Sequence, residues 1–104
     1  MKIAVTYQDG DIFQHFGHTE FFKIYDIENT DIVKTEIVST NGSGHGALAQ
    51  FLHEHSVDTL ICGGIGGGAQ MALSQAGIKL YGGVTGKADD AVNALLNNKL
   101  NYDP

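Results

Sequence analysis

The chain has 104 residues, of which 42% are hydrophobic and 17% charged, and this composition is typical of one globular domain spanning residues 1–104. Its net charge of −6 comes without any cluster of lysine or arginine, which argues against a nucleic-acid partner, and no apolar run approaches the roughly 20 residues that cross a bilayer. The single cysteine has no partner for an internal disulfide, and no basic-then-apolar leader opens the chain, so we expect a cytoplasmic protein.

The first part of the chain predicts three strands. A β-branched run over 2–7 indicates the first, and an irregular loop rich in aromatic residues and histidine follows over 11–20. Residues 21–27 and 32–38 alternate apolar and polar positions, and the polar turn at 28–31 between them indicates a β-hairpin.

A loop and a helix are expected next. Residues 39–46 are rich in glycine and serine, and the helix that follows has Leu48 and Leu52 on one apolar face. We expect this loop and residues 8–20 to be mobile without a ligand, because neither has enough apolar residues to hold it in place.

The second half begins with a strand and a helix. An apolar run over 57–62 predicts the strand, and the glycine-rich turn 63–68 joins it to a helix over 68–76 that Gly77 closes.

A second strand–helix unit completes the chain. A brief strand over 78–81 leads through another glycine-rich loop, 82–86, to a helix whose apolar face includes Ala88 and Val92. Residues 97–104 are expected to fray.

The element order β-β-β-α-β-α-β-α predicts a three-layer α/β fold, with a five-stranded mixed sheet and helices on both faces. If the first strand lies beside the fourth, the sheet order is 3-2-1-4-5, which fits the ribonuclease H topology. Strands 1, 3, 4 and 5 then end at one edge. Loops 8–20, 39–46, 63–68 and 82–86 would converge there, where open α/β sheets bind ligands.

The turn after the fourth strand is the first candidate for a binding site. Its five glycines are Gly63, Gly64, Gly66, Gly67 and Gly68. Glycine permits a positive φ and lets a ligand lie against the backbone with no Cβ in between. The unpaired N–H groups at a helix start carry partial positive charge, so the turn suits an anionic ligand.

Candidate metal ligands would reach the same edge of the sheet. They are His15, His18, His45 and Cys62. In the segment His-Phe-Gly-His at 15–18, two imidazoles three residues apart can share a ligand if the loop turns, and Phe16 and Gly17 would then contact the bound group. The same spacing also fits exposed loop histidines, and Cys62 also fits a small buried hydrophobic residue.

Three familiar kinds of site lack essential parts. Residues 64–69 fit the dinucleotide-binding glycine pattern, but the next strand does not end in the carboxylate that such a site uses. Nucleases of the ribonuclease H topology hold two metals with several carboxylates, whereas only Asp9 and Asp11 lie near this edge. A closed structural zinc site needs four ligands and usually paired cysteines.

Three segments together resemble a known family. They are Ile3-Ala4-Val5, His15-Phe16-Gly17-His18 before the aromatic pair at 21–22, and the glycine turn from Ile61 to Ala69. With the segment 76–81 and the closing helix, the sequence resembles the nitrogenase iron–molybdenum cofactor biosynthesis family, that is, NifX and the C-terminal domain of NifB. The resemblance implies a ribonuclease H-like domain that binds a metal–sulfur cluster without catalysis of its own, with the ligand position on residues 15–18.

The sequence therefore favours a small carrier of an iron–molybdenum-type metal–sulfur cluster or its precursor, which exchanges this cargo with donor and acceptor proteins and is not an enzyme. Such clusters are anionic and accept imidazole or thiolate at an exposed metal, and a carrier that must release its cargo is served by one or two protein ligands. The first alternative is a phosphate- or nucleotide-binding hydrolase that uses the glycine turn at 63–68. The second is a regulatory domain with a vestigial pocket.

Overall fold

The computed structural model describes residues 1–43 and 45–103, without the side chain of His45. The strands are β1 (Lys2–Gln8), β2 (Asp11–Ile12), β3 (Phe21–Glu28), β4 (Asp31–Ser39), β5 (Thr59–Ile61) and β6 (Lys79–Tyr81). The helices are the short 3₁₀ helix η1 (Phe16–His18) and the α-helices α1 (His45–Glu54), α2 (Gly67–Gln75) and α3 (Ala88–Leu96). No helix in these described residues is long and apolar enough to cross a membrane.

The strands form one mixed sheet in the order β4-β3-β1-β5-β6, with β2 paired to β1 off this path. The pairs β1–β3 and β3–β4 are antiparallel, whereas β1–β5 and β5–β6 are parallel. The expected α/β class with a mixed sheet is confirmed, but the sheet has six strands rather than five.

The additional strand follows from a tight turn. Asp9 and Gly10 both have positive φ, 50° and 91°, so the chain folds back after two residues and pairs Tyr7 with Ile12. An Asp-Gly pair is a strong signal for such a hairpin. The expectation that 11–20 is wholly irregular is therefore wrong at its first two residues and again over η1.

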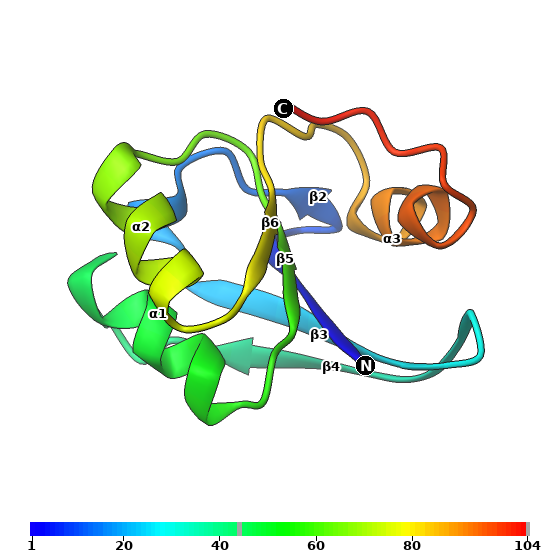
Figure 1. Ribbon diagram of the computed structural model, residues 1–104, viewed down its shortest axis with the longest axis horizontal. Coiled ribbons are helices and arrows are strands. Elements are labelled where there is room, and N and C mark those ends of the chain that lie inside the picture. Colours follow the sequence, from blue (N-terminus) through cyan, green and yellow to red (C-terminus); the bar gives the residue numbers. More distant parts are fainter. Residues whose placement is uncertain (44, 104) are drawn as a thin grey trace.

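Helices cover both faces of the sheet, with α1 and α2 on one side and α3 on the other (Figure 1). Alternation along β1 explains this, because successive side chains of a strand point to opposite faces. Ala4 packs in a cluster with Leu48 and Leu73 of α1 and α2. Ile3 and Val5 pack in a second cluster, which includes Val92 of α3.

Polar contacts also hold α3 against the sheet. The hydroxyl of Tyr25 on β3 donates a hydrogen bond to Asp89 at 2.6 Å, and Lys23 forms an ion pair with the same carboxylate at 2.8 Å. Burial and this contact raise the pKa of Tyr25 far above its usual value. The hydrogen bond from Lys23, followed by that from Tyr25, lowers the pKa of Asp89.

Two local predictions are confirmed. The turn between β3 and β4 has Asn29 and Thr30 at φ values of 51° and 73°, which is the pattern of a two-residue hairpin. Gly77 has a φ of +77° after α2, its N–H donates to Ser74, and the N–H of Ile78 donates to Leu73. These two bonds form the glycine-closed C-terminal motif expected at this position.

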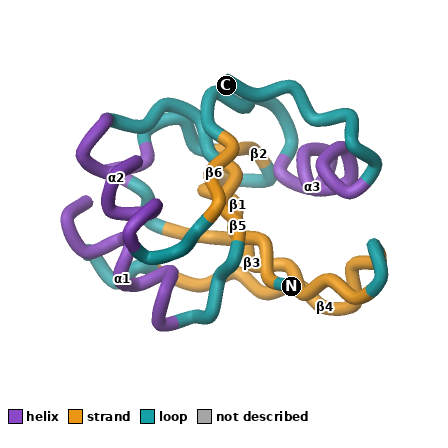
Figure 2. Tube along the Cα trace, in the orientation of Figure 1, coloured by secondary structure: helices purple, strands orange, loops and turns teal. Residues whose placement is uncertain are grey.

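The carboxyl ends of β1, β4, β5 and β6 meet at one edge, and the loops after them touch as expected. The N–H of Thr40 donates to the carbonyl of Glu20 at 2.9 Å, and the N–H of Gly83 donates to the carbonyl of Gly63 at 2.9 Å. The C-terminal segment also returns to the end of β6, where the N–H of Asp103 donates to Gly82 at 2.8 Å (Figure 2). The expected fraying implied that the C-terminal residues have no partners. Instead, the contact at Asp103 holds this segment against the end of β6.

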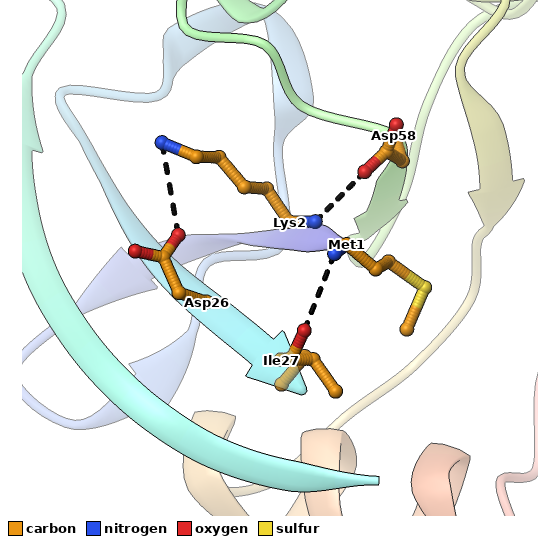
Figure 3. A network of polar contacts seen from close by, with 5 residues as sticks. All are labelled: Met1, Lys2, Asp26, Ile27 and Asp58. Atoms are coloured by element: carbon orange, nitrogen blue, oxygen red, sulfur yellow. Dashed lines mark hydrogen bonds and ion pairs between the residues drawn. The ribbon is translucent and has the colours of Figure 1, made fainter. Parts of the chain in front are cut away.

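The opposite edge of the sheet is held by the first two residues (Figure 3). The amino group of Met1 donates to the carbonyl of Ile27, and the backbone N–H of Lys2 donates to Asp58 at 2.8 Å. The side chain of Lys2 lies 3.7 Å from Asp26. The start of β1 is therefore tied to β3 on one side and to the beginning of β5 on the other.

Candidate functional site

The His-Phe-Gly-His segment is a tight turn anchored by its aromatic residue. Phe16 is buried and packs beside Phe22 in the core under α1 and α2, with ring centroids 6.4 Å apart. The N–H of His18 donates a hydrogen bond to the carbonyl of His15. The hydroxyl of Thr19 donates one to the carbonyl of Phe16 at 2.7 Å. The turn therefore presents both histidines on the surface while the residue between them holds the segment in place.

This anchoring contradicts the reason given for expecting the loop 8–20 to be mobile, whereas the mobility itself stays a prediction. Ile12 and Phe16 are only 4% and 2% exposed, so the loop does have apolar residues that hold it to the core. The companion loop, 39–46, contains residue 44, which lies outside the described part of the chain.

The turn after β5 carries the histidine segment directly. The N–H of Gly64 donates to the carbonyl of Gln14 at 2.8 Å, and the N–H of Phe16 donates to the carbonyl of Gly64 at 3.1 Å. His15 and Gly64 thus form an isolated parallel bridge. Two stretches almost fifty residues apart in the sequence are thus joined by backbone hydrogen bonds.

The first two glycines of the turn make this close approach possible. A Cβ built on Gly63 would lie 2.5 to 2.7 Å from atoms of Gln14, and one on Gly64 would lie 3.0 Å from the carbonyl oxygen of Gln14. The N–H of Gly64 is also already bonded to that oxygen. Packing against Gln14 therefore explains why glycine stands at these two positions, independently of any ligand.

Close packing does not explain the remaining glycines of the turn. A Cβ built on Gly66, Gly67 or Gly68 would meet nothing within 4 Å. None of the glycines over 63–68 is among the positive-φ residues of the described chain, so this turn does not use the positive φ that glycine permits. Gly66 is the N-cap of α2, and its carbonyl accepts the first helical bond, from Gln70. The N–H groups of the first turn therefore have no acceptor within the helix.

The two segments enclose an open hollow of about 480 Å³. We call it the histidine hollow, and it is lined by His15, Phe16, Gly17, His18, Gly64, Ile65, Gly66, Gly68 and Ala69. Seven of the residues expected to bind the cluster or its metal are thus brought together here. None of these lining residues is acidic, although the chain has 12 aspartates and glutamates.

Three other candidate residues do not line the hollow in the described structure, and the fourth is His45. Gly63 is buried, and Gly67 is exposed but is not among the residues that line the hollow. Cys62 is fully buried in the core between the sheet and the helices α1 and α2, and this burial raises the pKa of its thiol to about 12. The side chain of His45 lies outside the described residues. A ligand role for Cys62 or His45 stays a prediction.

Within the described part of the chain, no three or more His, Cys, Asp or Glu side chains are grouped closely enough to hold a metal ion. The described side chains of the histidine hollow therefore offer two imidazoles and bare backbone. Such a set suits a bulky group with only one or two bonds to protein better than a single ion that needs a closed shell of ligands.

A second hollow includes Phe13 and Glu20, which precede and follow the histidine segment in the sequence. We call it the aromatic hollow; it has a volume of about 380 Å³ and is lined by Tyr7, Gln8, Asp9, Phe13, Glu20, Phe21 and Ile37. Tyr7 and Phe21 are direct partners across β1 and β3, so they lie on the same face of the sheet. The sequence analysis missed this hollow, although the paired aromatic residues at the ends of two adjacent strands were a usable signal.

Comparison with known proteins gives concordant results. A family model described as dinitrogenase iron-molybdenum cofactor matches residues 1–98. Uncharacterized protein MJ0580 of Methanocaldococcus jannaschii is 31% identical over 105 residues, covering 96% of this chain and 89% of that protein.

Solved structures agree over almost the full length. The crystal structure of PH0822 has a TM-score of 0.93 at 30% identity and covers 99% of this chain and 95% of its own. The apo form of the orange protein from Desulfovibrio gigas has a TM-score of 0.83 at 26% identity and covers 98% and 92%. The resemblance found in the sequence is confirmed, and the chain belongs to the dinitrogenase iron-molybdenum cofactor family.

Proposed function

We propose that this protein is a carrier that binds an anionic metal–sulfur cluster, of the iron–molybdenum type or a precursor of it, in the histidine hollow. His15 and His18 bind exposed metal atoms of the cluster, and the backbone at the start of α2 faces its sulfides. The protein stores and transfers the cluster without turnover.

The observation that carries this proposal is the bare backbone at Gly66 and Gly68. Both glycines lack a positive φ and both have open space where a Cβ would lie, so the fold does not require glycine at either position. Within a helix, glycine costs roughly 0.5–1 kcal/mol relative to alanine, which applies to Gly68 in the first turn of α2, whereas glycine is a favourable residue at an N-cap such as Gly66. A bulky ligand resting against the backbone would account for glycine at position 68 and would use the open backbone beside it at Gly66.

Charge and ligand chemistry support the same conclusion. The hollow has no acidic lining residue, and the helix N-terminus contributes partial positive charge, so an anion is favoured there although the whole chain carries −6. Imidazole binds iron and other transition metals, and backbone N–H groups hydrogen-bond to cluster sulfides. Two imidazoles leave most of the cluster free for transfer to an acceptor.

The test is anaerobic purification from cells that make metal–sulfur cofactors, followed by analysis of bound metal and acid-labile sulfide. We expect a brown or orange protein containing both, and a colourless one for the His15→Ala/His18→Ala double variant. A colourless, metal-free wild-type protein that also fails to take up a cluster supplied in solution would overturn the proposal.

A second experiment, on the metal-free protein, separates the proposed carrier from a hydrolase. Thermal stabilisation of the metal-free protein by phosphate or nucleotides, together with their turnover, would favour the hydrolase, because a ligand specific for the native state raises stability by mass action.

The proposal also includes a ribonuclease H-like classification, a cytoplasmic location, and donor and acceptor proteins as partners.

A further inference from the structure

The strand β4 lies at the edge of the described sheet. It pairs with β3 on one side, and no described strand pairs with its other side. It is nine residues long, contains no proline and is exposed along most of its length. Long, exposed edge strands are ready templates for pairing with another chain.

Apolar side chains are concentrated at this edge. Val33 and Ile37 of β4 are 54% and 52% exposed, and Phe21 at the start of β3 is 42% exposed. These are half of the exposed large hydrophobic residues in the described chain. Exposed apolar residues grouped on one edge favour a surface that is covered in the working protein.

The charges of β4 are arranged symmetrically about Thr35. Lys34 precedes it and Glu36 follows it, and neither residue takes part in the ion pairs of the described structure, which involve Lys2, Lys23 and Lys87. In an antiparallel pair of identical strands, opposite residues lie on the same face. The twofold axis must therefore pass between the two copies of one residue, which face each other.

We compare the three registers in which the axis passes at Lys34, Thr35 or Glu36. Only one of them places opposite charges across from each other. With the axis through Thr35, Lys34 of each copy lies opposite Glu36 of the other, and Val33 lies opposite Ile37. With the axis through Lys34 or Glu36, two like charges face each other directly, which is destabilising. A lone lysine on an edge strand opposes pairing, but here the glutamate two positions on neutralises this effect in the Thr35 register.

We propose that two copies of this chain pair antiparallel along β4, with Thr35 on the twofold axis, and so join their sheets into one continuous sheet. Val33 has no partner on β3 because the register shifts there, so regular pairing is restricted mainly to residues 34–36 and the residues that follow them. The interface is therefore small, and the dimer exchanges with monomer. Because the axis is perpendicular to the sheet, the two aromatic hollows, each of which includes Ile37, open on the same face of the dimer.

Charge reversal gives a direct test by sedimentation equilibrium of the full chain at concentrations up to about 1 mM. Lys34→Glu or Glu36→Lys alone puts like charges opposite each other at two places and should raise the dimer dissociation constant at least about tenfold. The double variant Lys34→Glu/Glu36→Lys restores both ion pairs with reversed sign and should dimerise as the wild type does. Lys99→Glu and Glu54→Lys change net charge by the same amounts away from β4 and should leave dimerisation unchanged.

Hydrogen exchange provides a second, independent measurement. Outward-facing amides within residues 34–36 should gain protection as the wild-type concentration rises, and should not do so in Lys34→Glu. Circular dichroism of each variant verifies that the fold is intact, which is expected because both side chains lie on an exposed edge.

Three results would overturn the proposal. One is a wild-type protein that remains monomeric at about 1 mM. Another is a dimer that neither single reversal weakens, since it would use another surface. The last is a dimer that the single reversals abolish but the double reversal does not restore, since its register would not be centred on Thr35.

Discussion

The ring of Phe13 contacts the imidazole of His15 edge to face, with centroids 6.0 Å apart and an interplanar angle of 75°. Phe13 lines the aromatic hollow, whereas His15 lines the histidine hollow, so this contact connects the two. The backbone of Phe13 is itself held by Thr6, whose carbonyl accepts its N–H at 2.9 Å and whose hydroxyl donates to its carbonyl at 2.8 Å. Phe13 is thus a fixed support for an exposed histidine.

Replacing Phe13 by leucine should weaken cluster retention by loosening His15. Aromatic ring contacts of this kind contribute about 0.5–1.5 kcal/mol, so a two- to tenfold decrease is expected. Bound metal per chain and the NMR line widths of the His15 ring are the measurements. Phe21→Leu changes the same hollow on β3 and should leave the His15 signals unchanged; equal effects of both variants would contradict a specific support role.

Removing the two imidazoles should abolish cluster retention without affecting the fold. His15 and His18 are exposed, so His15→Ala and His18→Ala should each change the free energy of unfolding by no more than about 0.5 kcal/mol. Each should lower bound metal several-fold, and the double variant should lower it at least tenfold. His53→Ala, an exposed histidine on α1, is the matched control. A double variant that retains the wild-type amount of metal would remove the basis for these ligands.

Gly68→Ala should separate stability from binding. Because Gly68 has no positive φ and open space at its Cβ position, alanine should stabilise the metal-free protein by up to about 1 kcal/mol. The added methyl group should reduce cluster binding, since it projects from a residue that lines the hollow. Urea unfolding and metal analysis measure the two effects.

Gly77→Ala is the converse control for that experiment. Gly77 has a φ of +77° at the end of α2, so alanine there should destabilise the protein and leave cluster binding unchanged. If Gly68→Ala bound the cluster as well as the wild type, the bare backbone would need another explanation.

The thiol of Cys62 should be unreactive in the native protein. With its pKa raised to about 12 by burial, the group is protonated at pH 8, and the thiolate is the reactive form. A disulfide reagent at pH 8 should modify it only after unfolding. Fast modification of the native protein would place the thiol at the surface and support its predicted role as a ligand.

The same pKa predicts a pH dependence of stability. Because the folded value lies above the ordinary value of 9.0, burial of the neutral thiol stabilises the fold fully below pH 9, and this contribution is lost as the pH rises toward 12. Comparing urea unfolding of the wild type and Cys62→Ala between pH 8 and pH 11 isolates the effect. The difference in unfolding free energy between the two proteins should decrease over this interval.

The sequence by itself determined the features that depend on local chemistry. The turn at Asn29 and Thr30, the glycine closing α2 at Gly77, and the alternation along β1 that divides Ala4 from its neighbours all follow from backbone preferences and side-chain periodicity. The convergence of the loops also followed, because parallel strands must end at the same edge of a sheet. The composition of the histidine hollow could therefore be predicted in large part.

Only the tertiary structure decided what depends on contacts between distant segments. The approach of Gln14 to Gly63 and Gly64 assigns those glycines to packing rather than to ligand binding, and no pattern in either segment reveals it. The side on which Cys62 points was equally open, since a residue at a strand end faces either the pocket or the core with equal ease. The physical reason is the same in both cases: local sequence restricts dihedral angles and periodicity, whereas burial and close approach are set by whichever distant segment packs against them.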